Sequence, residues 1–327
     1  MVIITMSYKG LLTSFIMLCL FGCKESNPGL DLEQEQVTTR RTDQFQAVAA
    51  IGPRLVVVGN FGVWLESSDR GNSWKRNQLP GQPPFIDIVS CPNQTFVALD
   101  FRGRVWLQQP DGQWLSKQAF DDGIGMACDN ANHLWAVGEY AQILTSADGG
   151  DSWRNVAISD EDLILTDIQF ITDNRAVAVG EFGTQLTSTD GGQSWQTGAE
   201  IAPDLYPASV YFADQQRGWV SSVSGTLYAT TDGGNSWQLQ QTGTSAPLYT
   251  LVPLNDSLIA VGGQGTVLSE QNDWHPWVPK EPFYCYLRGA IDIGADQLLV
   301  AGGNGCLKVI DPLKEVVVAT EFAGGQS

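Results

Sequence analysis

The nonapeptide TSTDGGQSW, from Thr187 to Trp195, returns along the chain at a nearly regular interval. Three further copies keep its Ser/Thr-x-Asp-x-Gly-x-Ser-Trp pattern, namely Glu66 to Trp74 (ESSDRGNSW), Thr145 to Trp153 (TSADGGDSW) and Ala229 to Trp237 (ATTDGGNSW). The aspartates of the four copies are separated by 79, 42 and 42 residues. A decayed copy, DGQW at Asp111 to Trp114, divides the longest interval, so the spacing indicates a structural repeat of about 41 residues.

The chemistry of this motif is that of a tight turn between two strands. An aspartate can accept hydrogen bonds from nearby backbone N–H groups, glycine supplies positive φ, and tryptophan is a large apolar anchor. We therefore interpret the conserved pattern within the chain as structural and not catalytic. The predicted structural residues are Asp69, Trp74, Asp148, Trp153, Asp190, Trp195, Asp232 and Trp237.

Each repeat also contains an apolar strand, a glycine-rich turn and a second strand. The first strands of the seven pairs begin at Leu55, Phe96, Leu134, Ala176, Trp219, Leu258 and Leu298. Their β-branched and aromatic content, together with the period, predicts an all-β fold, a seven-bladed β-propeller with four-stranded blades over residues 44–327. Two segments are candidates for the strand that closes the ring, Gln36 to Arg40 and Val316 to Phe322.

The repeated nonapeptide resembles the Asp-box, or BNR repeat, which joins the third and fourth strands of a propeller blade on the outside of the ring. Over Phe45 to Ile310 the chain resembles the photosystem II stability/assembly factor-like group of BNR propellers. The Val-Gly-x-x-Gly turn and the Thr-x-Asp-Gly-Gly-x-x-Trp box of that group are present from Val179 to Trp195. The resemblance implies a non-enzymatic assembly role. It does not imply photosynthesis, because this chain lacks a clustered arginine patch of the kind described for photosynthetic members.

The N-terminus has the features of a bacterial lipoprotein. Lys9 precedes the apolar run Leu11 to Phe21, which is too short for an ordinary membrane span, and the run ends in Leu20-Phe21-Gly22-Cys23. We predict a signal peptide over residues 1–22, lipidation at Cys23 and a flexible linker over residues 23–43. These features predict a periplasm-facing lipoprotein of the bacterial cell envelope. Lys24 stands where aspartate would favour retention, so the outer membrane is preferred over the inner.

The net charge of −18 makes nucleic acid an improbable partner and leaves the lipid anchor as the only predicted membrane contact. Four cysteines remain beyond Cys19 and Cys23, and an oxidising compartment permits disulfides between them. Their positions in the repeats favour Cys91 with Cys128 and Cys285 with Cys306, whereas four buried free thiols are the alternative.

Nothing in the sequence indicates catalysis, a metal or a cofactor. His133 and His275 lie in different repeats without a partner at metal-ligand spacing, and no phosphate-binding loop occurs. Sialidase-like enzymes share the Asp-box, but Gly52-Pro53-Arg54-Leu55 does not match their Arg-Ile-Pro signature. We therefore predict a monomeric, non-enzymatic propeller that binds an envelope protein. The alternatives are a sialidase-like or other glycan-acting hydrolase and a glycan-binding propeller.

One face of the predicted ring carries a candidate partner-binding surface. The turns between the second and third strands of the first four blades concentrate aromatic and charged residues, which suits a protein interface. The predicted partner-binding residues are Phe61, Phe101, Arg102, Tyr140, Phe182, Glu139 and Glu181. The alternative is that the rings fold down between the blades as part of the core.

Overall fold

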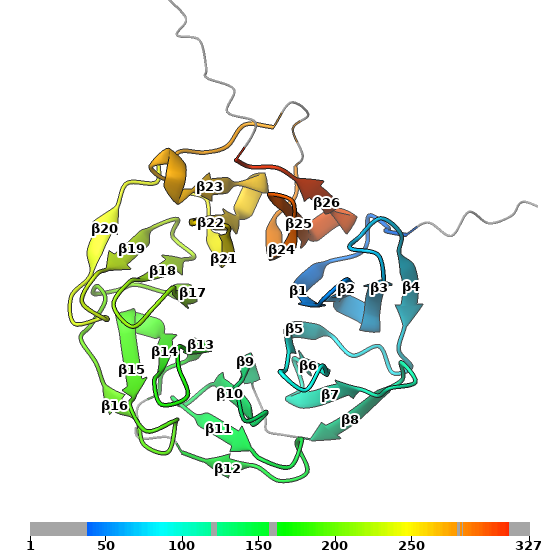
Figure 1. Ribbon diagram of the computed structural model, residues 1–327, viewed down its shortest axis with the longest axis horizontal. Helices are drawn as coiled ribbons and strands as arrows, with labels where there is room; N and C mark the ends of the chain where they lie inside the picture. The colour runs from blue at the N-terminus through cyan, green and yellow to red at the C-terminus, as the bar shows by residue number, and fades with distance from the viewer. Residues whose placement is uncertain (1–37, 119–122, 157–161, 280–281, 283, 314–327) are drawn as a thin grey trace, which may run out of the picture. The chain divides into compact units, whose positions relative to one another are not determined.

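Seven antiparallel sheets surround a common centre in the computed structural model, which describes residues 38–118, 123–156, 162–279, 282 and 284–313 (Figure 1). All of these residues belong to one unit, Gln36–Ser327. The only helical elements among them are 3₁₀ turns of three residues each. No helix of this part of the chain has the length and apolar character that crossing a bilayer demands. The prediction of a seven-bladed β-propeller is confirmed.

The first four blades have four strands each. Blade one contains β1 (Phe45–Ile51), β2 (Arg54–Gly59), β3 (Val63–Ser67) and β4 (Lys75–Gln78). Blade two contains β5 (Phe85–Ser90), β6 (Phe96–Asp100), β7 (Arg104–Gln108) and β8 (Trp114–Gln118). Blade three contains β9 (Gly123–Cys128), β10 (Leu134–Gly138), β11 (Ile143–Ser146) and β12 (Arg154–Asn155). Blade four contains β13 (Leu165–Phe170), β14 (Ala176–Gly180), β15 (Thr184–Ser188) and β16 (Gln196–Thr197).

The remaining three blades complete the ring. Blade five contains β17 (Pro207–Phe212), β18 (Gly218–Ser222), β19 (Leu227–Thr230) and β20 (Gln238–Gln240). Blade six contains β21 (Leu248–Leu254), β22 (Ser257–Gly262) and β23 (Val267–Ser269). Blade seven contains β24 (Leu287–Gly294), β25 (Gln297–Gly302) and β26 (Leu307–Ile310). Blades six and seven thus show three strands each among the described residues, and a single bridge from Leu268 to Pro276 stands in place of a fourth strand in blade six.

Within each blade the strands follow one another from the centre outward, in sequence order. The first strand begins opposite the end of the second, as Phe45 pairs with Gly59 in blade one. The turns between the second and third strands therefore share a face with the loops that connect one blade to the next. We call this the turn face. The Asp-box turns between the third and fourth strands lie on the opposite face, which we call the box face.

The core lies between neighbouring blades. The second strands are apolar along their whole length and buried on both sides, as in β14, because a blade packs against each of their surfaces. Seven clusters of buried side chains result in the described part of the chain, one for each pair of neighbouring blades. Burial of apolar area at these interfaces is the main force that holds the ring together.

The ring closes by packing between blades one and seven. Phe45 and Val57 of blade one share a buried cluster with Leu299 and Ala301 of blade seven. Thr38 to Arg40 form no strand, so the part of the first candidate closing strand that is described does not pair with a blade. Gln36, Val37 and the second candidate, Val316 to Phe322, lie outside the described residues.

The Asp-box turns have one hydrogen-bonding scheme in all four complete copies. In the copy at Asp190, the carboxylate accepts bonds from the Ser188 hydroxyl (2.8 Å), the Ser194 N–H (2.9 Å) and the Ser194 hydroxyl (2.5 Å). These donors stabilise the ionised form, and they lower the pKa of Asp190 to about 2. The pKa values of Asp69, Asp148 and Asp232 are lowered for the same reason.

The tryptophans of the four boxes differ in burial. Trp195 is 3% exposed and packs against Trp135 of the preceding blade, with ring centroids 6.5 Å apart. Trp74, Trp153 and Trp237 are only partly buried. The Asp-box aspartate therefore serves the turn in the same way each time, whereas its tryptophan contributes unequally to the core.

Both cysteine pairs favoured by the sequence are paired in the structure. Cys91 and Cys128 join blades two and three with a Cα–Cα distance of 5.3 Å. Cys285 and Cys306 lie within blade seven, 6.3 Å apart between Cα atoms. The first pair is therefore a covalent link between neighbouring blades, and the second ties the segment before β24 to the start of β26.

Candidate functional site

Four aromatic side chains project from the turn face of blades one to four. Phe61, Phe101, Tyr140 and Phe182 are exposed by 56, 61, 56 and 49%, respectively. We call these four residues the aromatic arc. Their rings lie at the surface and are not part of the inter-blade core, which removes the alternative that they fold down between the blades. Figure 1 shows the blades that carry them, from β1 to β16, as one continuous half of the ring.

Three residues of the aromatic arc have a backbone conformation that is costly for a large side chain. The φ angles of Phe61, Tyr140 and Phe182 are 53°, 57° and 57°, in the left-handed region. The same turn position is occupied by Gln264 in blade six and by Asn304 in blade seven, with φ of 56° in each. Asparagine tolerates this conformation better than phenylalanine or tyrosine, so the turn itself does not explain the aromatic rings.

Blades two and five have a different turn at this position. Arg102 and Ser224 occupy the places that correspond to Phe61, but neither has positive φ. In blade two the Asp100 carboxylate accepts the N–H of Arg102 (2.8 Å), and the exposed ring belongs to Phe101, one residue earlier. Arg102 is exposed beside it. The equivalence of the turns predicted from the sequence is therefore correct in register, while the conformation differs in two blades.

The residue before the aromatic ring has a structural task in at least two blades. The Glu181 carboxylate accepts the Ile164 N–H (3.1 Å), and in blade one Asn60 accepts the Gln44 N–H (2.9 Å) in the same way. Both bonds fasten the turn to the loop that leads into the same blade. Glu181 is thus a structural bond acceptor as well as a member of the predicted surface, and Glu139 occupies the matching, partly buried place in blade three.

The sequence missed one member of the aromatic surface. Tyr206, in the loop before β17, is 42% exposed and lies 5.6 Å from the Phe182 ring, centroid to centroid. Asp162 and Asp204 are exposed in loops of the same face. Asp121, Asp122, Asp160 and Glu161, which the sequence also places there, lie outside the described residues.

The centre of the ring contains a cavity of about 360 Å³ that the sequence did not predict as a site. The first strand of every blade contributes to its wall, and each of these strands has a β-bulge at its second residue. A bulge changes the direction of the side chains next to it, and here it repeats with the blades. The seven bulge residues, all of which line the cavity, are Gln46, Ile86, Ile124, Thr166, Ala208, Tyr249 and Arg288.

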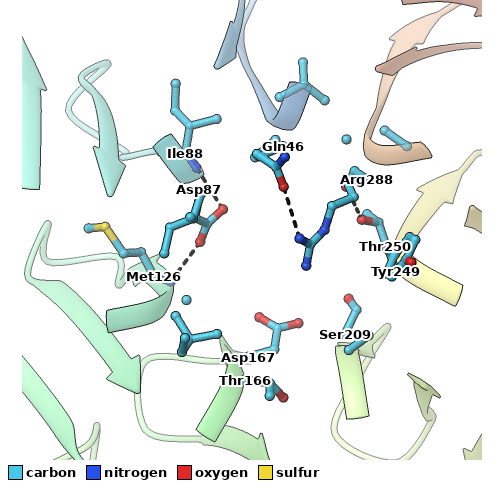
Figure 2. A pocket seen from close by; sticks show the side chains of 18 of the residues that line it. Gln46, Asp87, Ile88, Met126, Thr166, Asp167, Ser209, Tyr249, Thr250 and Arg288 are labelled. Atoms are coloured by element: carbon cyan, nitrogen blue, oxygen red, sulfur yellow. Dashed lines mark hydrogen bonds between the residues drawn. The ribbon is translucent and has the colours of Figure 1, made fainter. Parts of the chain in front are cut away.

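Two carboxylates in this cavity join neighbouring blades. The Asp87 carboxylate accepts the N–H of Ile88 (2.8 Å) and that of Met126 in the next blade (2.9 Å) (Figure 2). Asp167 accepts the N–H groups of Ile168 and Val210 at 2.8 Å each. Burial raises the pKa of Asp87 to about 6 and that of Asp167 to about 7, and the Asp87 charge adds to the second shift.

A single cation faces these carboxylates across the cavity. Figure 2 shows Arg288 pointing into the space that Asp87 and Asp167 also face. Its guanidinium donates to Gln46 Oε1 (3.0 Å) and lies 5.1 Å from the centre of the Tyr249 ring. Neither carboxylate forms an ion pair with any group in the described ranges. The cavity therefore has an acidic side, from blades two and four, and a basic side, from blade seven.

Metal-ligating side chains form no cluster in the part of the chain that the structure describes. No group of three or more histidine, cysteine, aspartate or glutamate side chains is arranged to hold a metal ion there. His133 bonds Asp129 (2.8 Å) and His275 bonds the Asn272 carbonyl (3.0 Å), in blades three and six, respectively. Neither histidine lines the central cavity.

A family model and several solved structures are similar to this chain, whereas no curated protein matches its sequence. The model of the photosynthesis system II assembly factor YCF48 matches residues 113–200, which include β8 to β16. The structure of YCF48 bound to a D1 peptide is 18% identical, with a TM-score of 0.59, and the match covers 69% of this chain and 77% of that one. YCF48 from Cyanidioschyzon merolae is 13% identical, with a TM-score of 0.64 and coverage of 82% and 95%.

Propellers of other kinds superpose equally well. Virginiamycin B lyase from Staphylococcus aureus has a TM-score of 0.67 at 9% identity, covering 82% of this chain and 94% of that chain. Structural likeness at such identities shows the fold and not the activity. The matching family model, in contrast, depends on the sequence of the repeats. The chain is a seven-bladed β-propeller that, over residues 113–200, resembles the photosystem II assembly factor YCF48.

Proposed function

We propose that this protein is a non-enzymatic binding module that takes part in the assembly of an envelope protein, which it recognises through the turn face. The observation that carries the proposal is the aromatic arc, with three of its rings at a left-handed turn position that Gln264 and Asn304 occupy in other blades, so the turn does not need aromatic side chains. Strain kept at a surface position points to a function of that position. A YCF48 structure contains a bound D1 peptide, which supports a protein client for a propeller of this type.

The proposal includes no chemical step. The carboxylates of the central cavity, Asp87 and Asp167, already accept backbone N–H groups from two blades each, which is a structural use. Exposed aromatic rings beside polar groups form the centre of many protein interfaces, where a few large side chains carry most of the binding energy. The acidic character of the chain favours a client with basic residues.

Photo-crosslinking in living cells tests this surface. A benzophenone side chain at position 61, 140 or 182 should capture the same client, identified by mass spectrometry, and the same probe at Gln264 should not. Gln264 is a matched control because it has the same φ in a blade outside the aromatic arc. The client is expected to be lost from an F61N/Y140N/F182N variant. Equal capture from Gln264 would contradict the proposal.

The triple variant has a built-in control for folding. Asparagine occupies the same turn position at Asn304, so the three substitutions remove the rings and relieve backbone strain. We expect its melting temperature to equal or exceed that of the wild type. A fall of many degrees with loss of the client would show that the rings support the fold, and the surface would then have no demonstrated role.

The anchor is part of the same proposal. Leu20-Phe21-Gly22-Cys23 has the pattern of a lipidation site, and Cys23→Ser should release the protein from the outer membrane into the periplasm. Mass spectrometry of the wild-type N-terminus should show the added lipid. An unmodified Cys23 peptide, with equal fractionation of both proteins, would refute the lipoprotein interpretation.

A further inference from the structure

The central cavity has a charge distribution that the fold alone does not require. Asp87 and Asp167 occupy equivalent places in blades two and four, directly after the bulge of the first strand. In blades five and six Ser209 and Thr250 hold that place and also bond the next blade: the Ser209 hydroxyl accepts the Leu251 N–H, and the Thr250 hydroxyl donates to the Arg288 carbonyl. A neutral hydroxyl is therefore enough for the bond between blades, and the two negative charges need another explanation.

Both carboxylates face the cavity without an ion-pair partner among the described residues. Burial raises the pKa of Asp87, whereas the charge of Arg288, the last of its causes, lowers it from across the cavity. Arg288 is the only positively charged residue of its lining, and its guanidinium is engaged by Gln46 and stacked on Tyr249. Blade three lies between the two acidic blades and has Gly125, without a side chain, at the place that the aspartates occupy in its neighbours. Asp87 and Asp167 are partly buried. A partly desolvated charge without an ion-pair partner is costly, so a cation that enters this space would be favoured.

The cavity is at the same end of the ring as the aromatic arc. Its lining comes from the first residues of the first strands, which begin at the turn face, and from Val223. Val223 belongs to the turn between β18 and β19, in the place that corresponds to Phe101. A protein that covers the aromatic arc is therefore next to the mouth of the cavity.

We propose that the central cavity is a binding site for one ammonium or guanidinium group, supplied by a lysine or arginine side chain of the bound client. Asp87 and Asp167 accept hydrogen bonds from the cation through lone pairs that the backbone N–H groups leave free. Arg288 limits the site to one cation, because its own charge repels a second. The inference depends on the proposed function only for the source of the cation, since the site itself needs no client.

Calorimetric titration of the full-length protein with N-acetyl-arginine amide tests the site directly. The neutral isostere N-acetyl-citrulline amide is the control for shape, and we expect binding of the cationic compound alone at pH 8. Asp167→Asn should weaken binding about tenfold or more, as expected for a lost hydrogen bond between charged groups. Equal binding of both compounds, or no binding of either, would overturn the inference.

A second variant guards against a misfolded Asp167→Asn protein. Arg288→Gln removes the opposing charge but keeps the backbone carbonyl that Thr250 bonds. It should tighten the binding of N-acetyl-arginine amide several-fold. An unchanged affinity in a folded Arg288→Gln protein would place the compound elsewhere on the molecule and would refute the site.

The wild-type protein provides a third test through pH. The ionisable side chains that line the cavity are Asp87, Asp167, Tyr249 and Arg288. The pKa values of about 6 and about 7 mean that both aspartates lose their charge between pH 8 and pH 5. Affinity for N-acetyl-arginine amide should fall over this interval, and a pH-independent affinity would contradict the role of the carboxylates.

The outcomes separate this site from the aromatic arc. The F61N/Y140N/F182N variant should still bind N-acetyl-arginine amide, because the four lining groups are unchanged. Client capture without binding of the compound would remove the cavity site and leave the proposed function standing. Binding of the compound without client capture at positions 61, 140 and 182 would refute the proposed function and leave the cation site in the cavity standing.

Discussion

Replacement of Trp195 by alanine should destabilise the propeller through the interface of blades three and four. Trp195 is 3% exposed, and a tryptophan buries roughly 200 Å². At about 25 cal/mol per Å², this area corresponds to about 5 kcal/mol, and measured tryptophan-to-alanine changes in cores cost about 3–5 kcal/mol. We therefore expect the free energy of unfolding to fall by about 4 kcal/mol. For a folded unit of this length, with an unfolding entropy of about 0.6 kcal/mol/K, the melting temperature should drop by about 7 °C.

Trp74→Ala is the matched control for this prediction. Trp74 has the same place in its Asp-box and donates the same bond, to the Gly71 carbonyl (3.0 Å), as Trp195 donates to the Gly192 carbonyl (3.2 Å). Its ring is only partly buried, so the loss should be clearly smaller. Scanning calorimetry and urea unfolding measure both variants. Equal losses would refute the reasoning from burial, and a lost client contact at an unchanged melting temperature would give the box a functional role.

The other predictions concern covalent links and pH. Removal of the Cys91–Cys128 disulfide, which spans 37 residues, should lower the free energy of unfolding by about 4 kcal/mol, and removal of the Cys285–Cys306 disulfide, which spans 21, by about 3 kcal/mol. Urea titration of the variants C91A/C128A and C285A/C306A measures both losses. The pKa of Asp190 is lowered to about 2, so its contribution to stability is complete above pH 4 and is lost as the pH falls toward 2; Asp190→Asn should show a flatter acid limb in thermal melts. Asp87 and Asp167 have raised pKa values, so their effect has the opposite sign, and the melting temperature should rise as the pH falls from 8 to 5. The variant Asp167→Ser, which places in blade four the residue that blade five has at this point, should weaken the rise in melting temperature. An unchanged profile of melting temperature against pH would contradict the raised pKa of Asp167.

The repeats made the architecture predictable because each one contains its own local signals. The strands β6, β10 and β14 begin at the predicted residues Phe96, Leu134 and Ala176, since turn residues precede each apolar run. The outer edge of blade six was less predictable. Its Asp-box has decayed, and among the described residues a single bridge, from Leu268 of β23 to Pro276, stands in place of the outer strand. The residues that follow Leu313 in blade seven lie outside the described part of the chain.

The sequence predicted the aromatic part of the candidate site but not the carboxylates of the central cavity. Exposure of Phe61, Tyr140 and Phe182 follows from their place in tight turns, but their left-handed conformation requires the structure. The cavity carboxylates were missed because Asp87 and Asp167 look like ordinary polar residues in alternating strands. One signal was present in the sequence, since FIDI and LTDI place an aspartate at the same point of two repeats. The convergence of strands far apart in sequence on one centre is a property of the ring, which no single repeat reveals.

The way in which the ring closes has a mechanical consequence. Every blade is an uninterrupted stretch of sequence, so no strand of the described residues crosses from blade one to blade seven. The junction depends on side-chain packing, on the hydrogen bonds of Gln44 and Gln46 with Tyr286 and Arg288, and on Asp43. Asp43 makes two bonds to the Arg76 guanidinium (2.6 and 2.8 Å), and its carbonyl accepts the Gly305 N–H (2.8 Å). The ion pair holds Asp43 to blade one, and the Gly305 bond holds it to blade seven, so a pull on the chain before Thr38 would load both contacts together. Under tension the contacts between blades one and seven would break first, while the hydrogen bonds within each of the seven sheets remain.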